Sequence, residues 1–331
     1  MSDIVNNNLD DRAERIRTER CIDQIKNLMK GVFLDYFEDP KTTELIINEN
    51  CDLWVEQVGS PMQKVGTIPS TTTTQIILTT AGFRGKIANA KNPILECNFP
   101  IEDCRFESVL KPCVSNPILD IRKKSNVIFT LESYVEREAL SQTQFDVICK
   151  AIVDCKNIVI VGGTGTGKTT FINAVIKKMN ELCPEDRVVT IEDTAELQLS
   201  CQNYNQLFAN EDVSMARLLK ATLRLRPNRI LVGEVRGSEA LDLLTAWNTG
   251  HPGGCASVHA NSAEDALTRI EMMTTMNENC PKNVEILIGQ AVDLVVYISR
   301  SKVDYKRRIE SIIQVNQYNR ITQKYEYEVI A

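Results

Sequence analysis

The sequence predicts an α/β protein of two domains, a small α+β domain followed by a domain with a largely parallel sheet. The chain has 331 residues, more than one ordinary domain holds. Residues 43–124 contain short β-rich runs between turn residues, whereas residues 157–235 alternate apolar strands with helices. A polar segment separates the two patterns. We therefore place the first domain at residues 1–128, a linker at 129–140 and the second domain at 141–331.

The first domain is expected to begin with one amphipathic helix, from about residue 10 to residue 37. Its apolar side chains recur at helical spacing: Ile22, Ile25, Leu28, Met29, Val32 and Phe33. We expect this face to pack against the rest of the domain, and contact with a membrane is the alternative. Further along, strands are expected at residues 44–48, 53–59, 94–100, 105–112 and 118–124, with one helix at 70–81.

The second domain shows strands and helices in turn. Strands are expected at residues 157–163, 187–193 and 229–235, and helices at 168–182 and 214–224. Three further β-rich runs, at residues 292–299, 306–317 and 324–331, are expected to close one side of the sheet.

Charge and cysteine usage exclude several classes of function. A net charge of −6 argues against a protein that holds free nucleic acid by its phosphates. The basic runs at residues 122–124 and 306–308 are interpreted as solvated faces. The 11 cysteines form no CxxC pair, so we expect reduced thiols and no zinc site. The polar start and the lack of a long apolar stretch predict a cytosolic chain that does not span a membrane.

A phosphate-binding loop is predicted between the strand at 157–163 and the helix at 168–182. The run GGTGTGKT fits GxxxxGK[ST] in the strand-to-helix context that the motif requires. Glycines let backbone N–H groups face phosphate oxygens, Lys168 adds a positive charge, and the Thr169 hydroxyl can ligate Mg²⁺. The nucleotide-binding candidates are Gly162, Gly163, Thr164, Gly165, Thr166, Gly167, Lys168, Thr169 and Thr170. No guanine-reading NKxD follows, which favours ATP.

Acidic residues after two later strands are the expected partners of Mg-ATP. Glu234 follows the apolar run ILVG, and Mg²⁺ explains a carboxylate at such a position, so Thr169 and Glu234 are the predicted metal ligands. Glu192, Asp193 and Glu196 follow the strand at 187–193, at the edge where α/β sheets bind ligands. Each of the three is a candidate base for the attacking water, and an acidic solvated turn is the alternative.

The two histidines lie in one glycine-rich segment, GHPGGCASVHANS, which is expected to enter a strand. Two histidines beside a phosphate-binding loop, in a chain without a CxxC pair, disfavour a zinc site. His251 and His259 are interpreted as γ-phosphate sensors or pivots, and a purely structural role is the alternative.

These four elements, in this order and spacing, resemble the secretion ATPase superfamily of type II and type IV secretion and type IV pili. Its members carry Walker A, Asp box, Walker B and His box motifs. The sequence is most similar to the conjugal-transfer ATPases of the TrbB branch over about residues 20–300. The runs that carry this likeness are LWVEQVG, NPILECNFP, RFESVLKP, IRKKS, LRLRPNRILVGEVRG and AWNTGHPGGCASVHAN.

The resemblance implies a RecA-like second domain and assigns several roles. Glu196 becomes the preferred catalytic base, with Asp193 and Glu192 supporting it, and His259 the residue that contacts or senses the γ-phosphate. Arg105 and Arg122 match the arginines by which the first domain of the family reaches the nucleotide. Arg224, Arg226 and Arg236 flank Walker B and are further candidates for phosphate or subunit contacts.

The resemblance also implies a cytoplasmic ATPase that works as one subunit of a hexameric ring at the inner membrane. Its partners would be inner-membrane components of a conjugation or type IV secretion machine. The Asp box reads EDTAEL rather than EDPIE, and the CxxC zinc module of related motors is missing, which favours conjugation. The alternatives are a type IV pilus or type II secretion motor and, in another class, an ATP-dependent switch with little turnover. A DNA translocase is disfavoured by the acidic charge.

Overall fold

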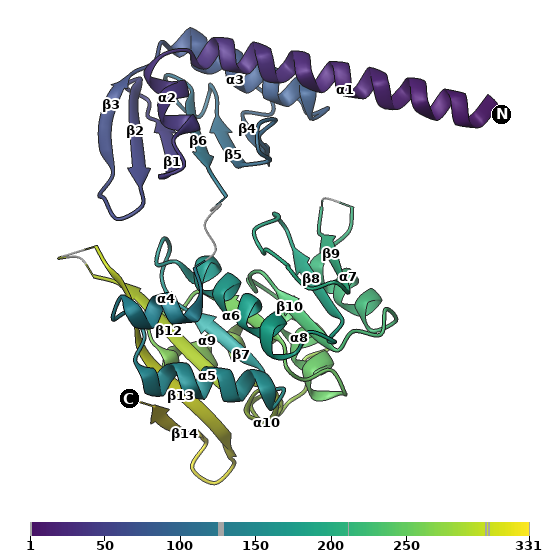
Figure 1. The fold of residues 1–331 in the computed structure, drawn as a ribbon, viewed down its shortest axis with the longest axis vertical. Helices are drawn as coiled ribbons and strands as arrows, with labels where there is room; N and C mark the ends of the chain where they lie inside the picture. The colour runs from purple at the N-terminus through teal and green to yellow at the C-terminus, as the bar shows by residue number, and fades with distance from the viewer. Residues whose placement is uncertain (1, 125–128, 211, 302, 304, 331) are drawn as a thin grey trace. The chain divides into compact units, whose positions relative to one another are not determined.

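The computed structural model describes residues 2–124, 129–210, 212–301, 303 and 305–330, and it divides the chain into two compact units, residues 1–126 and 127–331. Residue 128, where we expected the first domain to end, lies outside the described residues. The unit from residue 1 holds a mixed helix and sheet structure, and the unit from residue 127 holds a larger sheet with helices on both faces (Figure 1).

The first unit is an antiparallel sheet with one face covered by helices. The sheet order is β3-β2-β1-β6-β5-β4. Its strands are β1 (Thr42–Ile47), β2 (Asp52–Gln57), β3 (Gln63–Thr67), β4 (Ile94–Asn98), β5 (Arg105–Val109) and β6 (Ile118–Arg122). The helices are α1 (Ser2–Met29), α2 (Val32–Glu38) and α3 (Ser70–Phe83), with α1 and α3 side by side. Buried side chains from these helices and from alternate strand positions form one core.

The single helix expected at residues 10–37 is two helices. Gly31 has a φ of 88°, outside the helical region, so the chain turns between α1 and α2. Ile25 and Met29 on α1, and Phe33 and Phe37 on α2, are all buried in the same core. The apolar face therefore packs within its own domain, as the first of the two alternatives predicted.

The second unit is built on an eight-stranded sheet in the order β14-β13-β12-β7-β11-β10-β8-β9. The strands from β12 to β9 in this order run parallel, and β13 and β14 extend one side antiparallel. The strands are β7 (Ile158–Val161), β8 (Val188–Glu192), β9 (Tyr204–Phe208), β10 (Arg229–Val232), β11 (Cys255–Val258), β12 (Leu294–Arg300), β13 (Arg307–Asn319) and β14 (Lys324–Ile330).

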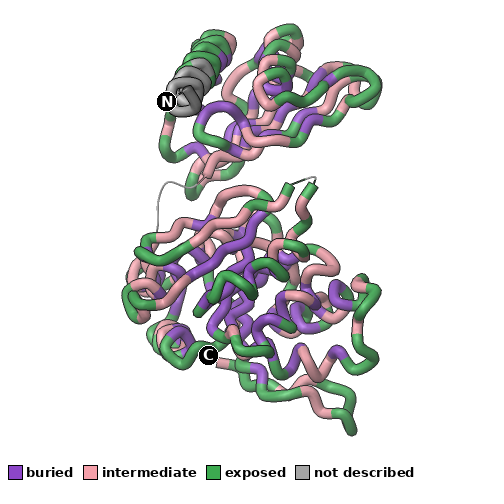
Figure 2. Tube along the Cα trace, turned by 90° about the vertical axis from the view of Figure 1, so that its right-hand side faces the viewer, coloured by how far each residue is buried: buried purple, intermediate pink, exposed green. Residues whose placement is uncertain are grey.

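Helices cover both faces of this sheet, which is why β7, β8, β10 and β11 are buried at every position. One face packs against α4 (Leu131–Glu136), α5 (Gln142–Val153) and α6 (Lys168–Leu182). The other packs against α7 (Met215–Thr222), α8 (Glu239–Asn248), α9 (Ala263–Thr274) and α10 (Val284–Ala291). Buried residues accordingly run through the centre of this unit (Figure 2).

Part of the expected linker is packed structure. Residues 131–136 form α4, where Leu131 and Tyr134 are buried and Tyr134 stacks edge to face on Phe171 with ring centroids 5.1 Å apart. The polar residues around α4 gave the segment the composition of a linker, but its two buried side chains belong to the core of the second unit.

A buried arginine links several segments at the amino-terminal ends of the parallel strands of the second sheet. Arg229, the first residue of β10, is 1% exposed, and its Nε donates to Asp186 at 2.5 Å. Its two Nη groups donate to the carbonyls of Gly253 at 3.2 Å and of Ile152 at 3.0 Å. One Nη also lies 3.2 Å from the sulfur of Cys183. One side chain thus joins the entries of three strands to the ends of α5 and α6.

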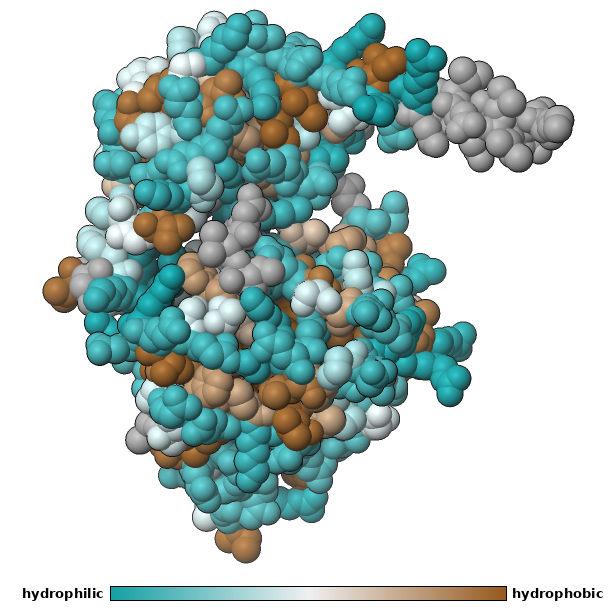
Figure 3. All heavy atoms as spheres, in the orientation of Figure 1, coloured by the Kyte–Doolittle hydropathy of each residue, from teal (hydrophilic) through white to brown (hydrophobic). Residues whose placement is uncertain are grey.

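No helix in the described part of the chain combines the length and the apolar character that a bilayer crossing requires. On the face drawn in Figure 3, hydrophobic residues occur in small groups among hydrophilic ones.

Candidate active site

Four loops of the second unit meet at one edge of its sheet. β7, β8, β10 and β11 are parallel neighbours, so their carboxyl ends lie at the same edge. The glycine-rich loop follows β7, and the loop with Glu196 follows β8. Glu234 follows β10, and His259 follows β11. Strand order therefore brings together the four elements that the sequence analysis singled out.

The glycine-rich loop, residues 162–167, has the backbone that the motif requires. Gly167 caps α6 in the left-handed region with a φ of 95°, and Gly165 has a φ of 71°. A Cβ on Gly162 would stand 2.4 Å from the carbonyl oxygen of Ile298 on β12. These glycines allow the loop to curl tightly between β7 and α6.

Lys168 is held inside this loop. Its Nζ donates to the carbonyls of Gly162 at 3.1 Å and Gly163 at 3.0 Å, and only 8% of the residue is exposed. The same nitrogen lies 3.3 Å from both ring nitrogens of His259. The structure thus places a cation and the His-box imidazole side by side above the loop.

Thr169 and Glu196 are joined directly. The Thr169 hydroxyl donates to Glu196 Oε2 at 2.9 Å. Asn173, one turn along α6, donates to the Glu196 carbonyl at 3.1 Å and accepts from the Gln198 amide at 2.9 Å. Asn173 was not among the residues predicted from the sequence, and its position on the inner face of α6 is the signal that could have identified it. It fixes the path of the acidic loop against the helix.

Glu192 is buried beneath that loop. It is 1% exposed, and its Oε1 accepts the amides of Glu196 and Leu197, each at 2.8 Å. Gly233 makes room for it, because a Cβ there would stand 3.0 Å from Glu192 Cγ. Burial raises the pKa of Glu192 to about 7, although the two amides act in the opposite direction.

Glu234 lies in a network of charged groups. It binds Arg236 at 2.6 Å through Oε2 and His259 Nε2 at 2.8 Å through Oε1. Arg236 also binds Asp193 at 2.6 Å. Burial raises the pKa of Glu234, but the hydrogen bond and charge of Arg236 outweigh it, so the pKa lies below its ordinary value. Glu234 is therefore a carboxylate near neutral pH.

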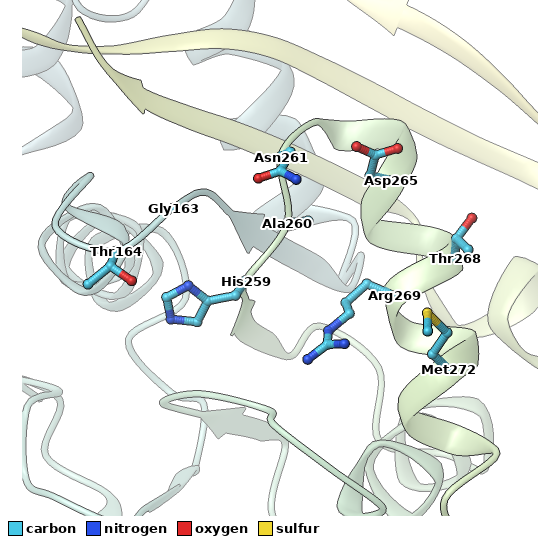
Figure 4. A pocket seen from close by; sticks show the side chains of 9 residues that line it. All are labelled: Gly163, Thr164, His259, Ala260, Asn261, Asp265, Thr268, Arg269 and Met272. Carbon is cyan, nitrogen blue, oxygen red and sulfur yellow. The ribbon is translucent and has the colours of Figure 1, made fainter. Parts of the chain in front are cut away.

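A pocket of about 570 Å³ opens beside His259 and the start of the glycine-rich loop (Figure 4). One wall is α9, from which Asp265, Thr268, Arg269 and Met272 face the pocket. No residue of α9 was among the site residues predicted from the sequence. The apolar residues of 263–274 recur at helical spacing soon after His259, and this pattern could have predicted a helix beside the site.

Some candidate residues lie elsewhere. Arg226 and Arg224 precede β10, so they are at the amino edge of the parallel sheet, opposite the glycine-rich loop. The structure therefore does not bring Arg226 to the phosphate loop of its own chain, and a contact with another subunit stays a prediction for it. His251 precedes β11 as His259 follows it, so the two histidines are at opposite edges and only His259 is in the site.

Arg105 and Arg122 belong to the first unit. They are directly opposite each other on β5 and β6, on the face of the sheet that α1 to α3 leave uncovered. Glu44 is the register partner of Arg122 on β1, and Asp120 shares this face. Burial and the nearby Glu44 raise the pKa of Asp120 to about 7, against the effect of Arg122.

The oxygen donors of the second unit suit Mg²⁺ bound together with a nucleotide. Thr169 supplies a hydroxyl and Glu234 supplies a carboxylate. The described residues contain no group of three or more histidine, cysteine, aspartate or glutamate side chains that could hold a metal by themselves. Mg²⁺ commonly takes only one or two protein ligands and completes its shell with phosphate and water, so the donor set fits.

Strand order, phosphate loop and carboxylates at one sheet edge define a RecA-like P-loop nucleoside triphosphatase. The chain belongs to a family within that class: residues 42–323 match the family described as Type II/IV secretion system protein.

Among curated relatives, the chain is 40% identical to the conjugal transfer protein TrbB of Rhizobium radiobacter over 281 residues, 85% of this chain and 86% of that protein. It is 31% identical to the type IV secretion system protein PtlH of Bordetella pertussis over 301 residues, 80% of this chain and 87% of that protein. Two solved structures share the fold. The ATPase DotB of Legionella pneumophila has a TM-score of 0.61 at 18% identity, covering 83% of this chain and 77% of that one. The pilus retraction motor PilT with bound ADP has a TM-score of 0.58 at 21% identity, covering 82% of this chain and 77% of that one.

Proposed function

We propose that this chain binds Mg-ATP on residues 162–170 and hydrolyses it to power a conjugation or type IV secretion apparatus. The observation that carries the proposal is the bond between Thr169 and Glu196 at the edge where Lys168, Glu234 and His259 also meet. A phosphate loop alone would support only binding. A carboxylate beside that loop supplies what hydrolysis needs in addition.

Binding exchanges one set of partners for another. Lys168 now donates to two loop carbonyls, and with ATP present it turns toward the β- and γ-phosphates. His259, 3.3 Å from that nitrogen, is placed to follow its movement and to contact the γ-phosphate. The amides of residues 162–170 and the amino end of α6 complete an anion site.

Geometry favours Glu196 as the base for the attacking water. Glu192 has almost no exposed surface and its Oε1 is occupied by two amides, so its role is to position the loop of Glu196. Asp193 is bound to Arg236. Glu196 is the member of the three whose carboxylate lies beside the Thr169 hydroxyl. It accepts the proton as water attacks the γ-phosphate.

Thr169 and Glu234 are the residues that would hold Mg²⁺. When bound, the ion neutralises charge on the phosphate oxygens and polarises the bond that breaks. Arg236 keeps Glu234 ionised and oriented by their 2.6 Å contact. Lys168 stabilises the charge that develops on the transferred group.

The first domain takes part through Arg105 and Arg122. Their guanidinium groups are candidates for a second set of contacts with the phosphates of the nucleotide. Such contacts would couple ATP binding to motion between the domains. We place this chain as one subunit of a hexameric ring at the cytoplasmic face of the inner membrane, with inner-membrane components of the machine as partners. The relatives named for conjugal transfer and type IV secretion support that setting.

Steady-state turnover by the purified full-length protein tests the proposal. Wild type should hydrolyse ATP with a dependence on Mg²⁺, and Glu196→Gln should bind ATP with little turnover. Glu185→Gln, at an exposed position before β8, is the matched control and should behave as wild type. A wild type that binds ATP with no more turnover than Glu196→Gln would support a nucleotide-dependent switch instead of a motor.

A further inference from the structure

Arg307 reaches the phosphate loop from a part of the chain that the sequence analysis interpreted as a solvated basic face. It is the first residue of β13, opposite Arg300 on β12. Its Nη2 donates to the Gly165 carbonyl at 3.4 Å. A Cβ on Gly167 would stand 2.8 Å from Arg307 Cδ and 3.1 Å from its Nε. The side chain thus lies flat against the loop, while Lys306 and Arg308 on either side are exposed.

The two basic residues at the loop hold different carbonyls. Lys168 holds those of Gly162 and Gly163, at the start of the loop. Arg307 holds that of Gly165, two residues further on. The Thr166 hydroxyl adds a bond to the Gly163 carbonyl at 2.9 Å. Both halves of the loop are therefore fixed by side chains before a ligand arrives.

The bond to Gly165 also decides where an amide points. Across a planar trans peptide, the carbonyl of one residue and the N–H of the next point in opposite directions. With the Gly165 carbonyl held by Arg307, the Thr166 N–H is directed away from Arg307. Thr166 is 9% exposed, and its hydroxyl donates to the Gly163 carbonyl, so the residue has a defined place in the loop. Backbone N–H groups of such a loop, at the amino end of a helix, are the donors that bind phosphate oxygens.

We propose that Arg307 is a positioning residue for the nucleotide: it holds the loop from outside and keeps the Thr166 amide directed at the phosphates. This inference rests on the proposed binding of ATP. It assigns Arg307 to the triphosphate and not to the base, because Arg307 lies against Gly165 and Gly167 of the phosphate loop. Since the ground state and the transition state use the same cradle, its loss weakens binding more than it slows the chemical step.

Calorimetric titration of full-length variants with two probes tests this role. The probes are a non-hydrolysable ATP analogue and inorganic tripolyphosphate, each with Mg²⁺. Arg307→Gln should raise the Kd of both by about tenfold, the low end for a charge-assisted bond since 3.4 Å is long. Its kcat at saturating ATP should stay within about threefold of wild type. Arg307→Lys keeps the charge and loses the guanidinium fork, so its Kd for each probe should lie between the Kd of wild type and that of Arg307→Gln.

Arg308→Gln is the matched control, because it removes the same charge from the adjacent, exposed position of β13. It should change neither Kd by more than about twofold. An unchanged Kd in Arg307→Gln would overturn the inference. A rise for the ATP analogue without a rise for tripolyphosphate would also overturn it, because Arg307 would then serve the base or ribose. A lowered unfolding temperature with an unchanged Kd would make Arg307 a purely structural residue. If wild type itself binds neither probe, the proposed function fails first.

Discussion

The two sheets present their candidate functional side chains in different ways. In the parallel sheet of the second unit, the residues that matter follow the strands and meet at one edge, as Lys168, Glu196 and His259 do. In the antiparallel sheet of the first unit, Arg105 begins β5 and Arg122 ends β6, so the two arginines are paired on the strands themselves, on the face that the helices leave uncovered. A parallel sheet gathers loop residues into a site, whereas an antiparallel sheet offers a surface that needs another partner.

The largest expected effect tests the edge of the second sheet. Lys168→Ala should lower ATP turnover by several orders of magnitude, because the transferred phosphoryl group loses a positive charge at the point where charge develops. Lys177→Ala, on the same helix, is the control. Turnover measured with purified protein decides, and circular dichroism checks that the fold survives. A Lys168→Ala variant within about threefold of wild type would contradict the site.

The next comparison separates two glutamates of one loop. Glu196→Gln should keep ATP affinity and lower kcat by about a hundredfold or more, because an amide cannot accept the proton of the water. Glu192→Gln should retain most of its turnover, because an amide oxygen can accept the same two backbone N–H groups. Binding and single-turnover rates of both variants measure the difference. The opposite pattern would reassign the base to Glu192.

Movement between the domains tests the proposed role of the arginines on the uncovered face of the first sheet. Arg105→Ala and Arg122→Ala should each weaken ATP-induced closure and raise the Kd of ATP several-fold, about 1 kcal/mol, because a guanidinium binds phosphate with two hydrogen bonds. Paired spin labels at Lys91 and Lys150, both exposed, would report the distance with and without a non-hydrolysable analogue. Because the chain has 11 cysteines, unnatural amino acids should carry the labels. The same closure in wild type and both variants would remove these arginines from the mechanism.

The smallest expected effect concerns the pKa of one carboxyl group in each sheet, the buried Glu192 and the half-buried Asp120. Glu192 and Asp120 both have a pKa raised to about 7, so between pH 4 and pH 7 the folded chain binds more protons than the unfolded chain. Their contribution to stability is therefore largest at low pH and is lost as pH rises toward 7. Asp120→Asn should reduce the fall in the free energy of unfolding between pH 5 and pH 7 by about 1 kcal/mol. The value is small because solvent near Asp120 screens its interactions. Urea unfolding at pH 5 and pH 7 measures it, and equal pH dependence in wild type and variant would contradict the assignment.

The sequence located the parts of the site that depend on strand order. A strand followed by GGTGTGKT and a strand followed by an acid predict the same edge, so Lys168, Glu196 and Glu234 could be grouped without coordinates. Arg226 precedes the strand expected at residues 229–235, so the same argument applied to it would have placed it at the opposite end of the sheet from Glu234.

Burial was the other property that the sequence did not reveal. In the sequence, Glu192 is one of three acidic residues that could each be the base. Its burial depends on the space that Gly233 leaves by having no side chain. Gly31 was read as part of one helix, although its backbone ends α1 and starts α2. Arg307 stands between two exposed basic residues, and pairing with β12 decides that it alone faces the loop.

Arg229 gives the second unit a rigid base. Its guanidinium joins the entries of β8, β10 and β11 to the ends of α5 and α6, all at the edge away from the nucleotide loop. In mechanical terms this edge is an anchor. A sheet whose strands are held together at one end should bend less at that end, and a displacement at the other end would then be taken up by the helices packed on the sheet. In an ATP-driven motor, less of each conformational change is lost to deformation when this end of the sheet stays in place.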